Sequence, residues 1–274
     1  SALTHLLSAQ MYQGLEDYTL AISEYDLALQ IDPGLTRALQ ELAQSYVRLE
    51  QQEEMIEYLN QHIAAHPQQL NGYSVLSNYY VSQNDWDAAI DVTKKGIQTN
   101  PNWSGGYGMI AGLYQQKGDM EQAVSTYQEG LKKLPEDNVL TLQLASTYEA
   151  MGEFQKARDL YEEVISRDPS IDVAANNLAS LLTDQFESPE NLQQALTLSS
   201  RFRDSEQPYF ADTFGWVNYK MGNYEDARSA LETAASSDDA IALFHYHLGR
   251  VYAALSMPEE ARQSFERAQR MANE

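Results

Sequence analysis

The chain has 274 residues and a formal net charge of -22 at pH 7, with 40 acidic residues, 18 basic residues and no cysteine. Such an acidic chain disfavours nucleic acid and anionic membranes as partners, because both attract cationic surfaces. The lack of cysteine excludes disulfides and thiolate metal sites, and no apolar run approaches the length that crosses a membrane.

A spacing of 34 residues recurs along the chain. Prolines fall at one phase of this period, at Pro33, Pro67, Pro101, Pro135 and Pro169. Within residues 104–137, two runs with apolar side chains at helical spacing are separated by Gly118 and end at Pro135, where proline removes a backbone donor. This pattern predicts pairs of short helices that repeat along the chain.

Eight such units account for the sequence. We expect them to form a single array at residues 2–35, 36–69, 70–103, 104–137, 138–171, 172–207, 208–241 and 242–274. Because the first unit follows Ser1 directly, we expect the chain to be a fragment of a longer protein. The sixth unit carries an insertion, in which Ser188 as N-cap and Pro189 as the first helical residue predict a helix start. We interpret the insertion as a tolerated surface loop, and the alternative is a lip on a binding surface.

Residue types recur in columns that predict the core between helices. In the first helices a leucine-like residue precedes a small residue, and a tyrosine usually follows three positions later, while an alanine recurs in the second helices. One of the best matches comprises Leu144, Ala145, Tyr148, Gly152, Ala157, Tyr161 and Pro169. These columns resemble the tetratricopeptide repeat. The resemblance implies an all-α, right-handed superhelical solenoid of about eight helical hairpins, with the first helices lining a concave inner face.

Charge is unevenly distributed between the two helices of each unit. Most acids lie on second helices and turns, whereas the first helices of units three to five carry only Lys117 and Glu149. The other polar residues there are mostly amides and hydroxyls, which donate and accept hydrogen bonds without the cost of desolvating a charge. The predicted groove contacts in units three to six are Asn71, Ser74, Asn78, Gly105, Gly108, Gly112, Gln115, Asn176 and Asn177. The glycines let a ligand or a neighbouring helix approach the backbone closely.

A stripe of aromatic and charged residues lies on the first helices of the last two units. Trp216 follows the small packing residue Gly215, so at about 100° per residue it is predicted to turn off the packed seam toward the groove. Tyrosine, tryptophan and arginine are enriched at interface hot spots. The predicted contacts here are Tyr209, Asp212, Trp216, Tyr219, Tyr246, His247 and Arg250. The alternative is that these aromatics are core between repeats.

These features predict a non-catalytic scaffold that binds a protein or peptide segment in its groove, with polysaccharide as the alternative ligand. No nucleophile, base and orienting residue form a readable set, and no cofactor or metal motif is found. Some tetratricopeptide adaptors grip a terminal carboxylate with inward lysines and arginines. The corresponding residues here are amides, serines and glycines, so that binding mode is not expected.

The C-terminal units indicate a cellular location and a second contact surface at the last helix. Residues 212–222, 246–249 and 259–262 resemble the closing repeats of bacterial envelope tetratricopeptide proteins found with exosortase and exopolysaccharide gene clusters. That resemblance implies a periplasmic rather than a cytoplasmic scaffold. The last helix, expected from Pro258 to about Met271, presents Phe265 and Ala268 with no capping helix after it. We therefore predict that this edge pairs with another chain or is covered by residues outside this sequence.

Overall fold

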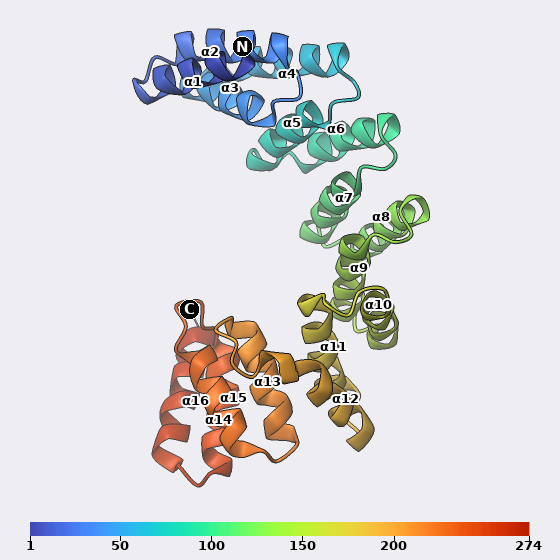
Figure 1. Cartoon of the computed structure of the whole chain (residues 1–274), viewed down its shortest axis with the longest axis vertical. Helices are drawn as coiled ribbons and strands as arrows, with labels where there is room; N and C mark the ends of the chain where they lie inside the picture. The colour runs from blue at the N-terminus through green and yellow to red at the C-terminus, as the bar shows by residue number, and fades with distance from the viewer. Residues whose placement is uncertain (274) are drawn as a thin grey trace. The chain divides into compact units, whose positions relative to one another are not determined.

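The computed structural model describes residues 1–273, which form α-helices joined by short turns (Figure 1). No strand occurs in that range, so the all-α class predicted from the repeats is confirmed. The helices are α1 (Ala2–Gly14), α2 (Tyr18–Ile31), α3 (Thr36–Arg48), α4 (Gln52–Ala65), α5 (Leu70–Ser82), α6 (Trp86–Thr99), α7 (Ser104–Gln116), α8 (Met120–Lys133), α9 (Asn138–Ala150), α10 (Phe154–Arg167), α11 (Asp172–Gln185), α12 (Pro189–Ser199), the 3-10 helix η1 (Ser200–Phe202), α13 (Pro208–Lys220), α14 (Tyr224–Ala235), α15 (Ala242–Ala254) and α16 (Pro258–Ala272).

Contacts between residues divide the chain into two compact units, Ser1–Gln143 and Leu144–Glu274. We refer to the first as the N-unit and to the second as the C-unit. Within each unit, helices that follow one another along the chain pack together as hairpins, and the odd-numbered helix is the first of each pair.

The turn inside most hairpins requires one residue with a positive φ. Glycine fills this position at Gly118, Gly152 and Gly222, with φ between +77° and +82°. Other hairpins place a residue with a side chain there, such as Glu16 at φ +60° and Glu50 at φ +59°. The left-handed conformation costs such residues roughly 1–2 kcal/mol, so the packing of the two helices must stabilise the turn.

The sixth hairpin starts its second helix as the sequence predicts. Ser188 accepts a hydrogen bond from the backbone N–H of Asn191 at 3.2 Å, and Pro189 is the first residue of α12. The Ser188 hydroxyl thus satisfies one of the N–H groups that have no partner inside the helix.

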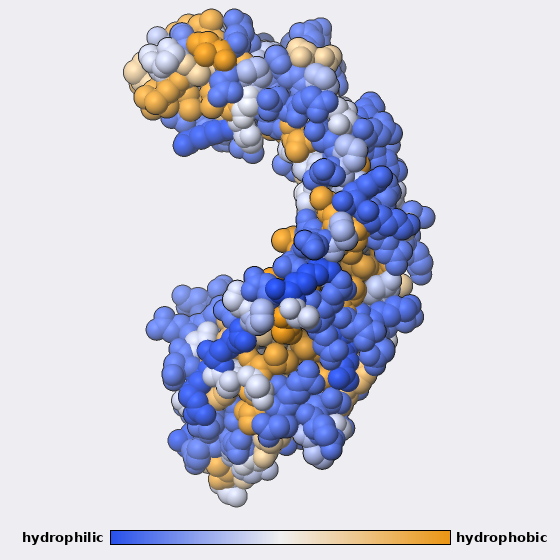
Figure 2. Space-filling model, turned by 45° about the vertical axis from the view of Figure 1, so that its right-hand side comes forward, coloured by the Kyte–Doolittle hydropathy of each residue, from blue (hydrophilic) through white to orange (hydrophobic). Residues whose placement is uncertain are grey.

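The repeated leucine and alanine columns form the core of both units. Leu42 in the N-unit and Leu144 in the C-unit occupy the same repeat position, and both are buried. Tyr148, which the column pattern places in the core with Leu144, is only half-buried. The first helix of the chain leaves several apolar side chains exposed, namely Leu3, Leu7 and Met11. Figure 2 shows apolar side chains gathered over this hairpin.

Candidate functional site

The predicted contacts on α5 differ in how far they face solvent. Asn71 is 6% exposed, and its Nδ2 donates to the Pro33 carbonyl at 2.8 Å. Its amide therefore ties two hairpins together and is not free to meet a partner, contrary to the prediction. Ser74 is half-buried and donates to the Leu70 carbonyl one turn earlier in α5, whereas Asn78 is exposed.

The glycines of α7 serve two purposes. A Cβ on Gly108 would lie 3.0 Å from Oε1 of Gln143, so this glycine accommodates a side chain from the neighbouring first helix α9. A Cβ on Gly112 would meet no atom within 4 Å, so this glycine leaves open backbone, whereas a Cβ on the exposed Gly105 would lie 3.2 Å from Nε1 of Trp103. Gln115, one turn further along, is half-buried and has a partner of its own.

Trp216 lies in the packing between α13 and α15 and does not turn toward open space. Its ring is 8% exposed and stacks on His247 with centroids 4.0 Å apart and on Tyr219 with centroids 4.8 Å apart. The indole Nε1 donates to Oδ1 of Asp184 at 2.8 Å. Trp216 therefore belongs to the core between repeats, as the alternative interpretation states, because its ring packs on the neighbouring first helix α15.

Asp212 and His247 form a buried pair beneath this stack. Nδ1 of His247 lies 2.9 Å from Oδ1 of Asp212, and both residues are buried. Burial raises the pKa of Asp212, while the hydrogen bond and charge of His247 oppose that rise. The pair joins α13 to α15. His247 is therefore a packing residue beneath the Trp216 ring and not an exposed contact.

The open part of the predicted stripe consists of two tyrosines and an arginine. Tyr209 is 48% exposed and Tyr246 is 41% exposed. Arg250 is also exposed and donates to the hydroxyls of Tyr246 at 2.9 Å and Tyr219 at 3.1 Å. These side chains are held in place while their outer faces stay open, as interface anchors require.

Four predicted residues meet in one cavity of about 200 Å³ in the C-unit. Asn176 and Asn177 enter it from α11, and Tyr209 and Asp212 enter it from α13. We call this cavity the amide pocket. Its remaining lining residues are Ser146, Glu149, Tyr161, Ser180, Thr213, Ile241, Leu243 and Phe244.

Two residues outside the predicted set organise the amide pocket. The Tyr161 hydroxyl donates to Oε2 of Glu149 at 2.9 Å, and Oγ of Ser146 lies 3.1 Å from the same hydroxyl. Burial raises the pKa of Glu149, the hydrogen bond from Tyr161 opposes the rise, and the charge of Asp184 adds to it. The sequence signals that could have identified this pair are the lone acid on an otherwise uncharged helix and a tyrosine that recurs at one repeat position.

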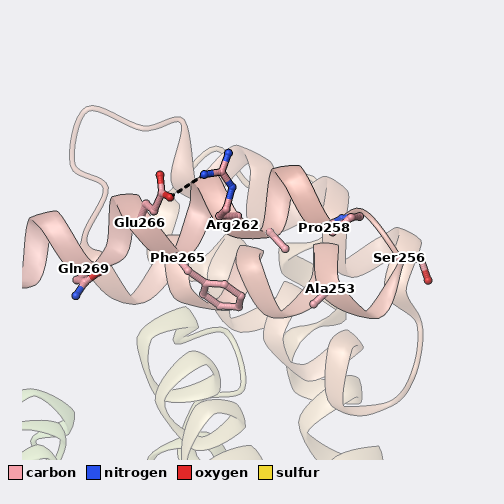
Figure 3. A pocket seen from close by; sticks show the side chains of 8 residues that line it. Ala253, Ser256, Pro258, Arg262, Phe265, Glu266 and Gln269 are labelled. Carbon is pink, nitrogen blue, oxygen red and sulfur yellow. Dashed lines mark hydrogen bonds and ion pairs between the residues drawn. The ribbon is translucent and has the colours of Figure 1, made fainter.

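A second hollow, of about 490 Å³, lies along α16. Figure 3 shows the Phe265 ring pointing from α16 toward the helix beneath it, with Arg262 and Glu266 paired at the rim. A Cβ on Gly249 of α15 would lie 2.6 Å from this ring, so the glycine makes room for it. Ala253, Pro258 and the other lining residues complete a largely apolar wall.

Residues 1–273 contain neither a helix suited to span a membrane nor a cluster of side chains suited to hold a metal ion. No helix in this range combines the length and apolar character that a membrane span needs. No group of three or more histidines and acids there is arranged to hold a metal ion.

Solved structures share the fold at low sequence identity. A chain of the APC/C hetero-tetramer Cut9-Hcn1 matches with a TM-score of 0.61 and 17% identity, over 98% of this chain and 53% of that one, so the present chain spans about half its length. PilF of Pseudomonas aeruginosa matches with a TM-score of 0.59 and 16% identity, over 73% and 90% of the two chains. YrrB matches with a TM-score of 0.50 and 19% identity, over 65% and 91%. No curated protein matches the sequence.

Family models identify the repeat directly. Three models described as tetratricopeptide repeat match residues 3–35 and 36–68, residues 114–182 and residues 213–274. Together they cover most of the chain. Arrays of this repeat generally act as non-catalytic scaffolds for protein interactions. The chain is a member of the tetratricopeptide repeat family.

Proposed function

We propose that this chain is a non-catalytic scaffold whose C-unit binds a protein or peptide segment on its first helices, around the amide pocket. The observation that carries the proposal is the composition of that pocket. Its lining comes from the first helices α9, α11, α13 and α15 or their N-terminal ends, with Tyr161 as the one contribution from a second helix. A segment bound there would contact four hairpins at once.

The exposed anchors beside the pocket support a protein ligand. Tyr209 lines the pocket, lies edge-on to Phe244 with centroids 5.2 Å apart, and keeps nearly half its surface open. Tyr246 and Arg250 extend the open surface along α15. Rigid tyrosines and arginines bury much area at a low entropy cost, which suits protein recognition. YrrB is described as a tetratricopeptide protein with an unusual peptide-binding site.

The N-unit residues that remain open extend this proposal. Asn78 presents an exposed amide, Gly112 presents open backbone, and Gly105 is exposed beside the Trp103 ring. With Ser74, Gly108 and Gln115 they form the proposed contacts on the first helices of the N-unit.

Carbohydrate is the second candidate ligand. The carboxylates, amides and hydroxyls that line the pocket beside an exposed tyrosine would also suit sugar hydroxyls and a sugar ring face. The resemblance of residues 212–222 to envelope proteins of exopolysaccharide gene clusters favours this ligand and a periplasmic site of action. Binding of the purified protein to an oligosaccharide array, with none to a peptide array, would select this candidate.

Site-specific crosslinking tests the protein candidate in cells. A photo-reactive phenylalanine analogue replaces Tyr209 or Tyr246 on first helices, and matched controls carry it at exposed Thr197 or Thr233 on second helices. We expect discrete protein adducts from the first-helix positions only. Equal adduct patterns from both sets of positions would overturn the proposed binding face.

A further inference from the structure

Tyr25 and Tyr161 occupy the same repeat position, four repeats apart, but the charged side chains around them differ. The Tyr25 hydroxyl in the N-unit donates to Oε2 of Glu41 at 2.5 Å and lies 2.6 Å from Oε1 of Gln13. Arg37 completes this cluster, because its Nε lies 2.7 Å from Oε1 of Glu41. Burial raises the pKa of Glu41, but hydrogen bonds from Tyr25, Arg37 and Gln10 outweigh it and hold that pKa below its usual value. The N-unit cluster therefore contains its own cation.

The C-unit keeps the tyrosine but has no internal cation. Glu149 stands at the repeat position of Gln13, Asn177 at that of Glu41, and Val173 at that of Arg37. No lysine or arginine lines the amide pocket, and across residues 1–273 no basic side chain forms an ion pair with Glu149. The nearby charge of Asp184 makes an uncompensated carboxylate less favourable still.

The hydrogen bonds in the amide pocket form a chain in which each donor points toward the Glu149 carboxylate. The Tyr161 proton goes to the Glu149 carboxylate, the strongest acceptor in reach, so the tyrosine oxygen accepts from Nδ2 of Asn177 at 3.5 Å and from the Ser146 hydroxyl. Oδ1 of Asn177 in turn accepts from Nδ2 of Asn176 at 3.2 Å. These donors are directed at partners inside the protein, and the chain of bonds ends in acceptors.

One of these terminal acceptors has no partner. Oδ1 of Asn176 is buried without a hydrogen bond, which is unfavourable when no donor replaces water. From the excess of acceptors, the missing cation and the cavity we propose that the amide pocket binds the positively charged end of a lysine or arginine side chain from the partner segment. This inference rests on the proposed function and specifies its ligand.

The opposite wall of the pocket suits the stem of such a side chain. Ile241, Leu243 and Phe244 are apolar, and the Tyr209 ring is partly open above them. Lysine and arginine bury their methylene stems on apolar surface while the charged end finds acceptors, and a tyrosine face attracts the cation. At about 30 Å³ per water molecule, the cavity volume equals that of several waters, which leaves room for an ammonium or guanidinium group.

The test is an NMR titration of the full chain that follows the side-chain amides of Asn176 and Asn177. The probes are three capped pentapeptides, Gly-Gly-X-Gly-Gly, in which X is arginine, lysine or citrulline, the neutral analogue of arginine. We expect saturable shifts with arginine or lysine, at least about tenfold weaker binding with citrulline, and weaker binding as salt increases. The arginine and lysine probes distinguish the two cations.

Matched variants keep the result interpretable. Glu149→Gln should weaken binding of the charged peptides at least about tenfold, whereas Glu41→Gln should leave it unchanged because Glu41 lies in the N-unit. Asn176→Asp is the second variant, and its added charge should strengthen binding and steepen the salt dependence. A folded Glu149→Gln protein with unchanged affinity would overturn the inference, and so would equal binding of citrulline.

Two further outcomes distinguish a failure of the cation inference from a failure of the proposed scaffold function. Shifts of the same amides with calcium chloride, which the peptides fail to reverse, would make the pocket a metal site and overturn the cationic side chain. No binding by any peptide, with the Tyr209 crosslinks still present, would overturn the inference and leave the scaffold proposal standing. Loss of the crosslinks as well would remove both.

Discussion

The clusters around Tyr25 and Tyr161 occupy the same repeat position and differ in where the charges sit. In the N-unit an arginine pairs with Glu41, and three side chains donate hydrogen bonds to its carboxylate. In the C-unit the acid is Glu149, the Tyr161 hydroxyl donates to it, and a cavity lies beside it. The repeat therefore determines the backbone, whereas a few charge positions determine whether the buried carboxylate has a cation inside the protein.

The largest expected effect is on the shared core. Leu42→Ala and Leu144→Ala each remove a buried leucine from the same column and should lower the free energy of unfolding by roughly 2–5 kcal/mol. Because repeats couple mainly to their neighbours, each loss should appear as faster hydrogen exchange in the unit that carries the change. Equal exchange in both units after either substitution would contradict this local coupling.

The next effect comes from the tyrosine hydroxyls. Tyr25→Phe removes a donor to a carboxylate that keeps an arginine partner, whereas Tyr161→Phe removes the donor from Glu149 and disconnects Asn177. Hydrogen bonds to charged groups contribute about 1.5–3 kcal/mol, and we expect the larger loss for Tyr161→Phe. Chemical denaturation of both variants checks the order, and a larger loss at Tyr25 would contradict the contrast between the clusters.

The two acids should affect stability with opposite sign. The pKa of Glu41 is lowered in the folded chain, so its contribution is present above the unfolded pKa and is lost as the pH falls through the folded value. The pKa of Glu149 is raised, so the folded chain binds the proton more readily and loses stability as the pH rises through that value. The other charged groups that face Glu149 are common to every variant compared: the charge of Asp184 acts on it, and Asp212, which pairs with His247, lines the same pocket.

Thermal melts of two single variants at pH 7 check this sign. Glu41→Gln should lower stability by about 0.5–1 kcal/mol, the scale of a partly exposed pair, and Glu149→Gln should raise it by less than about 1 kcal/mol in the absence of ligand. The difference between the variants should shrink as the pH falls, first when Glu149 takes up a proton and, at lower pH, when Glu41 does. Shifts of the same sign at pH 7 would contradict the assignment of charge.

The smallest expected change concerns the C-terminal helix. The apolar hollow along α16 agrees with the predicted open edge, and association through that edge remains a prediction. Ala268→Arg, on the half-buried side of α16, should change stability by under about 0.5 kcal/mol while reducing association at high concentration. Sedimentation velocity measures this, and a strictly monomeric parent protein would remove the prediction.

The sequence predicts the fold well because one backbone unit repeats and each copy restates the same columns. It also identifies Asn176, Asn177, Tyr209 and Asp212, which share the amide pocket. The partner contact predicted for Trp216 was wrong, because the angle at which a residue leaves a helix does not show whether its ring folds back on a neighbour.

Sequence reasoning missed the pair that organises the pocket. Glu149 appeared only as an isolated charge and Tyr161 only as part of a packing column. Their meeting depends on side-chain reach between a first and a second helix, which spacing along one helix does not reveal. Comparison of equivalent repeat positions, Gln13 with Glu149 and Glu41 with Asn177, would have pointed to them.

The most direct test of the central claim is the pKa of the Glu149 carboxyl itself. ¹³C NMR of the side-chain carboxyls, with the Glu149 signal assigned by its loss in Glu149→Gln, follows the titration with and without the arginine pentapeptide. In the free protein the pKa should lie above the usual value for glutamate, and saturating peptide should lower it, while Glu41 stays below that value in both samples. A Glu149 pKa that the peptide leaves unchanged would contradict the claim that this pocket lacks a cation and takes one from its partner.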